Sequence, residues 1–151
     1  MSPVNELSTV DRGAVKDLIE RSELGSIEFH EVSAKRFEGV KDSDESRDGQ
    51  ITLGFQHRSD QDGFGIRIVG DVAVPLGEVR VIAAVDYKLL RGDLPPQRVV
   101  ELFANEVAVM TLFPYLREGI ASITSKVFGT PITLPVAQRG QIGFEVTGPD
   151  Q

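Results

Sequence analysis

The sequence has 151 residues, of which 40% are hydrophobic and 26% are charged, a composition typical of one soluble globular domain. Its formal net charge of −7 makes nucleic acid an unfavourable partner, because the phosphate backbone would be repelled. Cysteine is absent, which excludes disulfides, thiolate catalysis and cysteine-ligated metal sites. No run is typical of a signal peptide or long enough to span a bilayer, so we expect a cytoplasmic protein.

The first predicted element is an amphipathic helix over residues 9–23. Apolar side chains between Val10 and Ile19 recur at helical spacing, which gives the helix one apolar face. Ser8 or Thr9 is a suitable N-cap, and Gly25 is suitably placed to end the helix.

Four extended segments follow, and no helical period interrupts them. Apolar and polar side chains alternate along them, which predicts strands with one covered face. The links SDQDG and PLG are short, so we expect an antiparallel meander that forms a single-layer sheet over residues 26–90. The polar link at 41–49 predicts a surface loop. The predicted strands are residues 26–37, 50–58, 64–74 and 78–90.

A helix is predicted from residue 97 to about residue 110, with Pro96 at its first turn. Its apolar side chains occupy most of its circumference, and one sheet face cannot cover that much apolar surface. We therefore expect a second copy of the chain to cover the other side, as in a homo-oligomer. The predicted interface residues are Val99, Val100, Phe103 and Val107.

Pro114 is expected to interrupt the helical stretch at 97–128 and to divide it into two helices. The second helix is predicted from the spacing of apolar residues between Leu116 and Val127, and Gly129 ends it. The tail at 129–151 is expected to be extended. The predicted fold class is α+β, with a four-stranded antiparallel sheet packed against two helices plus an N-terminal helix, all in one domain.

Residues that would carry catalysis are scarce. His30 and His57 lie in predicted strands without a carboxylate or serine at motif spacing, so they receive no functional role. The acidic run in the polar loop departs from a calcium loop at Ser46, Arg47 and Leu53. We therefore predict no catalytic residue, no metal site, no cofactor and no enzymatic activity.

Large apolar residues, in contrast, are abundant near the predicted junction of sheet and helices. Most belong to the core, and a minority could line a groove that binds apolar segments of a partner. The candidate groove residues are Phe55, Leu89, Leu90, Leu102, Phe103, Leu112 and Phe113.

The run M-T-L-F-P-Y-L-R-E at residues 110–118 resembles the signature of the SecB protein-export chaperones, which reads close to N-I-L-F-P-Y-A-R-E. The segments at 120–127 and 129–136 resemble the family's second helix and its G-x-F-P-x-L-x-L-x-P-V tail. The order of four strands and then two helices is also that of the family, so the resemblance covers about residues 26–138. The signature positions that match are Leu112, Phe113, Pro114, Tyr115, Arg117 and Glu118.

The resemblance implies an ATP-independent holdase that binds unfolded polypeptides in hydrophobic grooves and keeps them export-competent or soluble. It also implies a homotetramer, a dimer of dimers in which the first long helix lies between the sheets of paired dimers. In typical members the SecA motor ATPase docks on an acidic sheet face, and the positions here that match that contact are Glu38, Leu76 and Glu78.

Two alternatives remain open. Divergent SecB-like proteins serve as chaperones of toxin–antitoxin systems and bind an antitoxin. The family's N-F-D-A-L tail motif is absent after Gln138, and the helix at 9–23 has no counterpart in typical members, which makes this the main alternative. The further alternative is an oligomeric scaffold or a small-ligand-binding α+β protein.

Overall fold

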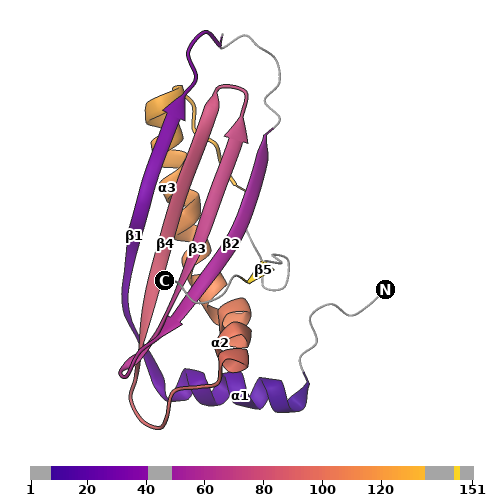
Figure 1. Ribbon diagram of the computed structural model, residues 1–151, viewed down its shortest axis with the longest axis vertical. Coiled ribbons are helices and arrows are strands. Elements are labelled where there is room, and N and C mark those ends of the chain that lie inside the picture. Colours follow the sequence, from indigo (N-terminus) through magenta and orange to yellow (C-terminus); the bar gives the residue numbers. More distant parts are fainter. Residues whose placement is uncertain (1–7, 41–48, 135–144, 147–151) are drawn as a thin grey trace.

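The computed structural model describes residues 8–40, 49–134 and 145–146, the last pair by its backbone alone. The predicted α+β fold is confirmed: four antiparallel strands are followed by helices, and an extra helix precedes them (Figure 1). The elements are α1 (Thr9–Glu20), β1 (Ser22–Arg36), β2 (Gln50–Ser59), β3 (Gly63–Val74), β4 (Gly77–Leu89), α2 (Gln97–Phe103), the π-helical turn η1 (Ala104–Ala108), α3 (Val109–Phe128) and β5 (Glu145–Val146).

The strand order in the sheet is β1-β4-β3-β2-β5, so the predicted meander is correct only for β2, β3 and β4. The first strand pairs with β4 along its length, from Ser22 opposite Leu89 to Arg36 opposite Gly77. Tight turns join β2 to β3 and β3 to β4, whereas the link from β1 to β2 is too long to impose a hairpin. Of the predicted loop at 41–49, residues 41–48 lie outside the described residues.

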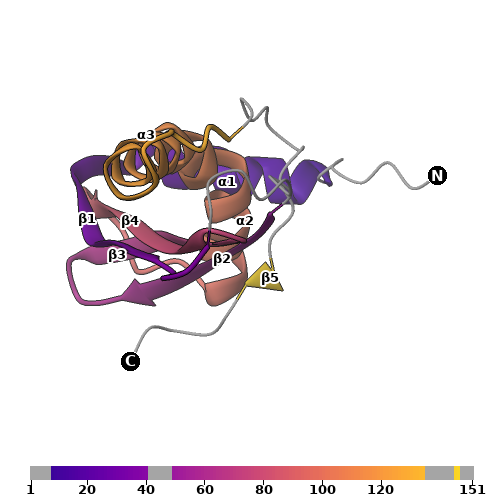
Figure 2. The ribbon, with the colours of Figure 1, turned by 90° about the horizontal axis from the view of Figure 1, so that it is seen from above.

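One face of the sheet is covered by α3, which packs against β1, β4 and β3 (Figure 2). Two glycines allow this close approach. A Cβ atom on Gly119 would lie 2.9 Å from the Phe29 ring and 3.0 Å from Val81, and one on Gly70 would lie 3.0 Å from Leu116. The core therefore lies between the apolar side of the strands and the inner side of α3.

The N-terminal helix ends earlier than predicted. Ser8 is the N-cap, its hydroxyl accepting from the Asp11 N–H at 3.1 Å, as expected. Arg21 caps the other end, and Gly25 lies within β1, where a Cβ atom would lie 3.3 Å from the carbonyl oxygen of Asp86. The glycine therefore allows a close approach of β4, where the register of the two strands shifts between Leu24 and Ile27, and does not end the helix.

Pro114 does not divide the helical stretch, which is one run of 32 residues from Gln97 to Phe128. The irregularity lies upstream, at the π-helical turn of η1, and Pro114 lies inside α3 with its ring exposed. By length and composition alone this run could cross a membrane, contrary to the sequence-based expectation. Less than half of its most apolar window is buried in the chain. The core helices of soluble proteins also meet these criteria of length and composition.

The segment after α3 is non-helical, as predicted, and two side chains of α3 hold it. Gly129 takes the left-handed conformation, with a φ of 81°, and ends the helix. The Thr124 hydroxyl accepts from the Ile132 N–H at 2.8 Å, and Arg117 Nε donates to the Leu134 carbonyl at 2.8 Å. Of the remaining tail, only residues 145–146 are described, as β5.

Candidate polypeptide-binding surfaces

The predicted groove residues do not gather in one groove of this chain. Four of them are core side chains, and Phe103 packs edge-on against the rings of Phe64 and Tyr87 at centroid distances of 5.3 and 4.8 Å. Leu90 is exposed just after β4. The core members are Phe55, Phe103, Leu112 and Phe113, and the half-buried members are Leu89 and Leu102.

The residues of the LFPYxRE motif have two structural roles. Leu112 and Phe113 point into the core, whereas Pro114 and Tyr115 are exposed on the outer side of α3. Arg117 binds the chain after the helix through its contact with the Leu134 carbonyl. Glu118 is exposed. The motif therefore seats α3 on the sheet and anchors the segment that follows.

The predicted oligomer-interface residues, which lie in α2 and η1, are divided between the core and the surface. Val100 and Phe103 are buried within the chain, and Val99 and Val107 are half-buried. Part of the cover that we expected from a second copy comes from α1, which packs on α2 through its buried Val15 and Leu18. An ion pair joins the two helices, with Arg98 donating to both carboxylate oxygens of Asp11 at 2.7 and 3.1 Å.

Strand β1 carries an exposed apolar surface that the sequence analysis did not identify. It lies at one edge of the sheet, and no other described strand pairs with its outer side. Phe29 contacts α3 at Gly119 yet keeps 39% of its surface exposed. A long edge strand with exposed apolar side chains is an adhesive surface. We define the β1 strip as the exposed apolar residues of this strand, Leu24, Phe29 and Val32, together with Phe37, which directly follows it.

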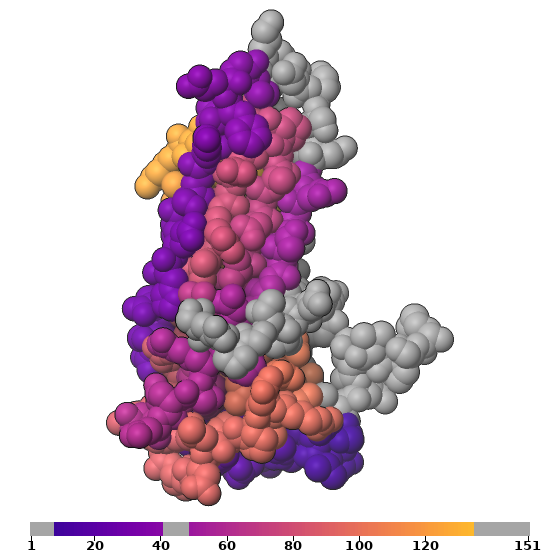
Figure 3. All heavy atoms as spheres, viewed as in Figure 1, coloured from indigo at the N-terminus to yellow at the C-terminus, as the bar shows by residue number. Residues whose placement is uncertain are grey.

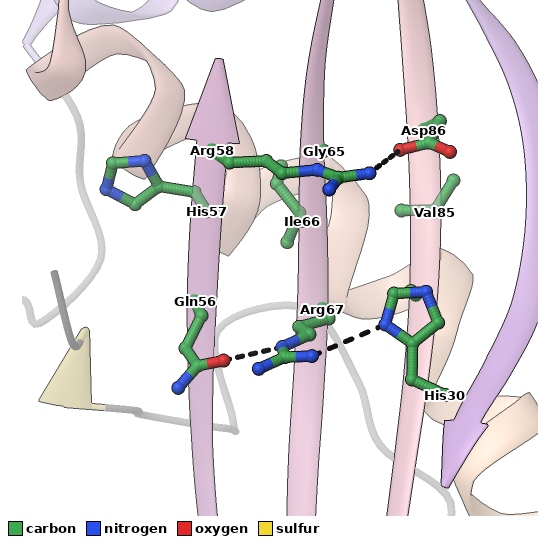
Figure 4. Close-up of a pocket in the computed structure, with 10 residues that line it drawn as sticks. His30, Gln56, His57, Arg58, Gly65, Ile66, Arg67, Val85 and Asp86 are labelled. Atoms are coloured by element: carbon green, nitrogen blue, oxygen red, sulfur yellow. Dashed lines mark hydrogen bonds and ion pairs between the residues drawn. The ribbon is translucent and has the colours of Figure 1, made fainter. Parts of the chain in front are cut away.

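The face of the sheet opposite α3, which is the face seen in Figure 3, carries polar and charged side chains from all four long strands, among them Glu31, Thr52, Asp71 and Arg80. A shallow hollow on it contains an Arg67 side chain that donates to Gln56 at 2.5 Å and lies 3.4 Å from His30 Nδ1 (Figure 4). Arg58 lies 3.9 Å from Asp86. Farther along, Arg80 lies 3.4 Å from Asp71. Acidic and basic side chains pair across the strands, so this face is not uniformly acidic. It therefore differs from the acidic sheet face that the resemblance to SecB implies.

The predicted motor-docking residues are brought together at one end of the sheet. The Phe37 N–H donates to the Leu76 carbonyl at 2.8 Å, which places Glu38 beside the turn between β3 and β4. Glu78 faces Lys35 across β1 and β4. Both glutamates are exposed and Leu76 is half-buried.

The histidines lie on opposite faces of the sheet. His30 is on the open face, whereas His57 points away from it and is buried (Figure 4). Its Nε2 lies 3.8 Å from a Glu101 oxygen and has no hydrogen-bond partner among the described residues. The described part of the chain has no group of three or more His, Asp or Glu side chains placed to hold a metal ion.

No family model and no curated protein matches this sequence. Among solved structures, the chain is similar to a SecB-like chaperone of Mycobacterium tuberculosis, Rv1957, in complex with a ChAD peptide from the Rv1956 HigA1 antitoxin. The TM-score is 0.72 at 16% identity, over 87% of this chain and 100% of that chain. A protein of unknown function from Streptococcus agalactiae is also similar, at a TM-score of 0.42 and 13% identity, over 76% of this chain and 96% of that chain, and no argument rests on it.

The first match shows that this chain has the SecB-like fold, which confirms the resemblance found in the sequence. The neighbour is described as a chaperone.

Proposed function

We propose that this protein is a SecB-like chaperone that binds extended, non-native polypeptides without ATP. The observation that carries the proposal is the exposure of apolar side chains on a SecB-like sheet, along the edge strand β1, at Ile51 of β2 and at Leu90 just after β4. Soluble proteins rarely expose such surfaces unless another polypeptide covers them.

Binding would draw on burial of apolar client side chains, at about 25 cal/mol per Å² of apolar surface removed from water. A client that binds only when unfolded is withdrawn from folding and aggregation by mass action alone. No nucleotide is required for this step. Many weak contacts along an extended chain then give useful affinity with low sequence specificity.

We further propose that the chain assembles as a homotetramer in the cytoplasm. The β1 strip is one apolar surface that a second copy would cover, and the half-buried Val99 and Val107 on the α2–η1 helix are another. This division assigns the β1 edge to assembly and leaves client binding to Leu90, Leu102 and the opposite edge of the sheet.

The client class that we favour is an antitoxin, because the structural neighbour from Mycobacterium tuberculosis is described in complex with an antitoxin peptide. Export precursors delivered to a SecA-type ATPase are the second candidate. The three residues gathered at the sheet end, Glu38, Leu76 and Glu78, favour that candidate.

Aggregation of a chemically denatured model substrate, followed by light scattering, tests the chaperone activity. Stoichiometric amounts of the protein should suppress the scattering. A variant carrying Leu90→Ser and Leu102→Ser should suppress it less, because two apolar contact residues become polar. Lys126→Ser, an exposed change on α3, is the control and should behave as the wild type. Undiminished aggregation with the wild-type protein would refute the proposal.

A further inference from the structure

A buried histidine lies between β2 and α2, and the proposed function does not use it. His57 is 5% exposed and points to the helix side of the sheet, away from the open face that Arg58 occupies (Figure 4). Its Nε2 has no hydrogen-bond partner among the described residues. A neutral imidazole carries either a donor or an acceptor at that nitrogen, and burying either one unpaired is unfavourable. The neutral ring therefore gains no hydrogen bond at Nε2.

A carboxylate of α2 faces this nitrogen. The Oε1 atom of Glu101 lies 3.8 Å from His57 Nε2, and the same oxygen accepts from the Gln97 amide at 3.1 Å. The glutamate side chain is 35% exposed, so it can turn toward the ring without losing its contact with water. A separation of 3.8 Å is too long for a hydrogen bond, and a shift of about 1 Å would form one.

The remaining charged groups near the histidine are directed elsewhere. On β2 itself, Arg58 lies on the open face, and the residue of β3 opposite the histidine is the apolar Ile66. In α2, Arg98 is bound to Asp11 of α1. Burial raises the pKa of Tyr87, a titratable group on the same side of the sheet, so its hydroxyl stays neutral. The carboxylate of α2 is therefore the charged partner that the described side chains offer to the ring.

We propose that His57 and Glu101 form a proton-dependent latch that holds α2 against β2 in mild acid and releases it above neutral pH. Histidine is the side chain that ordinarily gains a proton between about pH 5 and 8. A protonated imidazole carries a positive charge and donates from both nitrogens, so it can bond to the carboxylate that the neutral ring does not reach. This inference goes beyond the proposed chaperone function and does not rest on it.

Two opposing effects determine the direction of the switch. Burial disfavours a charged ring, and an opposite charge at short range favours it. Protonation breaks no hydrogen bond at Nε2, so the ion pair sets the direction. In an unfolded chain a histidine titrates near pH 6.5 and a glutamate near pH 4.3. The latch therefore adds stability between about pH 4.5 and 6.5, where both groups are charged, and this contribution is lost as the pH rises further.

Hydrogen exchange of the full-length protein, followed by mass spectrometry at about pH 5.5 and about pH 8, tests the latch. Glu101→Gln keeps the shape of the side chain and removes its charge. At the lower pH this variant should reduce the protection of the α2 amides about three- to tenfold relative to those of α3 in the same sample. At the higher pH the variant and the wild type should agree. An equal loss at both pH values, or no loss at the lower one, would overturn the inference.

Variants at the histidine show whether the pH dependence comes from this ring. In a protein that carries His57→Phe, which keeps a ring but cannot take up a proton, Glu101→Gln should no longer have a pH-dependent effect. His57→Gln serves the same purpose should the phenylalanine variant fail to fold. His30→Gln removes the other of the two histidines, on the open face, and should leave the effect of Glu101→Gln intact. A pH-dependent effect that persists without His57 would contradict the latch.

Discussion

Thr124 shows how one buried polar side chain determines the path of the chain after α3. It is fully buried, its hydroxyl donates to the Ile120 carbonyl at 2.6 Å, and it accepts from the Ile132 N–H at 2.8 Å. Helix interiors tolerate a threonine that bonds back to the preceding turn. Here the same hydroxyl also supplies an acceptor to a backbone donor that would otherwise lack one.

Replacing Thr124 by valine keeps the shape of the side chain and removes the acceptor. We expect the free energy of unfolding to fall by about 1 kcal/mol, because the part-buried Ile132 N–H loses its hydrogen-bond acceptor. Chemical denaturation measures the change. Thr130→Val makes the same chemical change at an exposed site and is the control. Equal stability of the two variants would contradict the role given to Thr124.

Asp11 joins α1 to the long helix, and its charge makes this contact sensitive to acid. The hydrogen bonds from Arg98 lower the pKa of Asp11, against the opposing effect of burial. A carboxyl whose pKa is lowered on folding adds stability above its unfolded pKa, near 4, and loses that contribution as the pH falls through its folded pKa.

The pH dependence gives a test of this ion pair. Arg98→Gln should lower the melting temperature at pH 7, and the difference from the wild type should shrink as the pH falls below about 4. Thermal unfolding by circular dichroism at a series of pH values measures it. Arg12→Gln, on the exposed side of α1, should show no such pattern. A difference independent of pH would mean that Arg98 acts through packing alone.

Among the elements, α3 contains a proline that does not break it. Pro114 removes one main-chain donor inside a continuous helical run, and its ring is exposed, so it contributes little packing. Tertiary packing of Leu112, Phe113 and Leu116 on the sheet outweighs the local cost.

Pro114→Ala should therefore raise the free energy of unfolding, by about 1–2 kcal/mol after allowance for the greater freedom that alanine gives the unfolded chain. Urea denaturation measures it. Gly129→Ala is a contrasting change at the residue that ends the same helix and should lower stability, because its φ of 81° is unfavourable for alanine. A loss of stability in Pro114→Ala would show that the proline is required for the helix geometry.

At the scale of the whole molecule, part of the uncovered apolar surface of the described residues lies on an edge strand. Val32, at 42% exposed, lies in the β1 strip on a strand whose outer side pairs with no other described strand. A second copy laid along this edge would satisfy the strand's backbone and cover the apolar side chains together.

Val32→Asp should reduce the mass of the particle in solution, because a carboxylate would be buried without a partner in that interface. Multi-angle light scattering after gel filtration measures the mass. Val10→Asp makes the same change at the more exposed site on α1 and should leave the mass unchanged. A wild-type protein that is monomeric would contradict the proposed assembly.

The sequence by itself determined the type and order of the N-terminal helix, the four long strands and the helical stretch that follows them, because alternation and helical spacing are local properties of the chain. It also identified the LFPYxRE run, whose apolar members seat α3 on the sheet. Glu38, Leu76 and Glu78 were selected by resemblance, and the structure brought them to one end of the sheet, since Phe37 pairs with the turn that contains Leu76.

Only the tertiary structure decided which strands are neighbours and which apolar side chains remain exposed. Placing β1 beside β4 left β1 at one edge of the sheet, with β2 and the two-residue β5 at the other, and packing of α3 buried Leu112 and Phe113, which were candidates for the groove. The continuity of the helix through Pro114 was also a tertiary outcome. Contacts between residues far apart in the chain decide these features, and the period of a sequence carries no information on which distant segment will cover it.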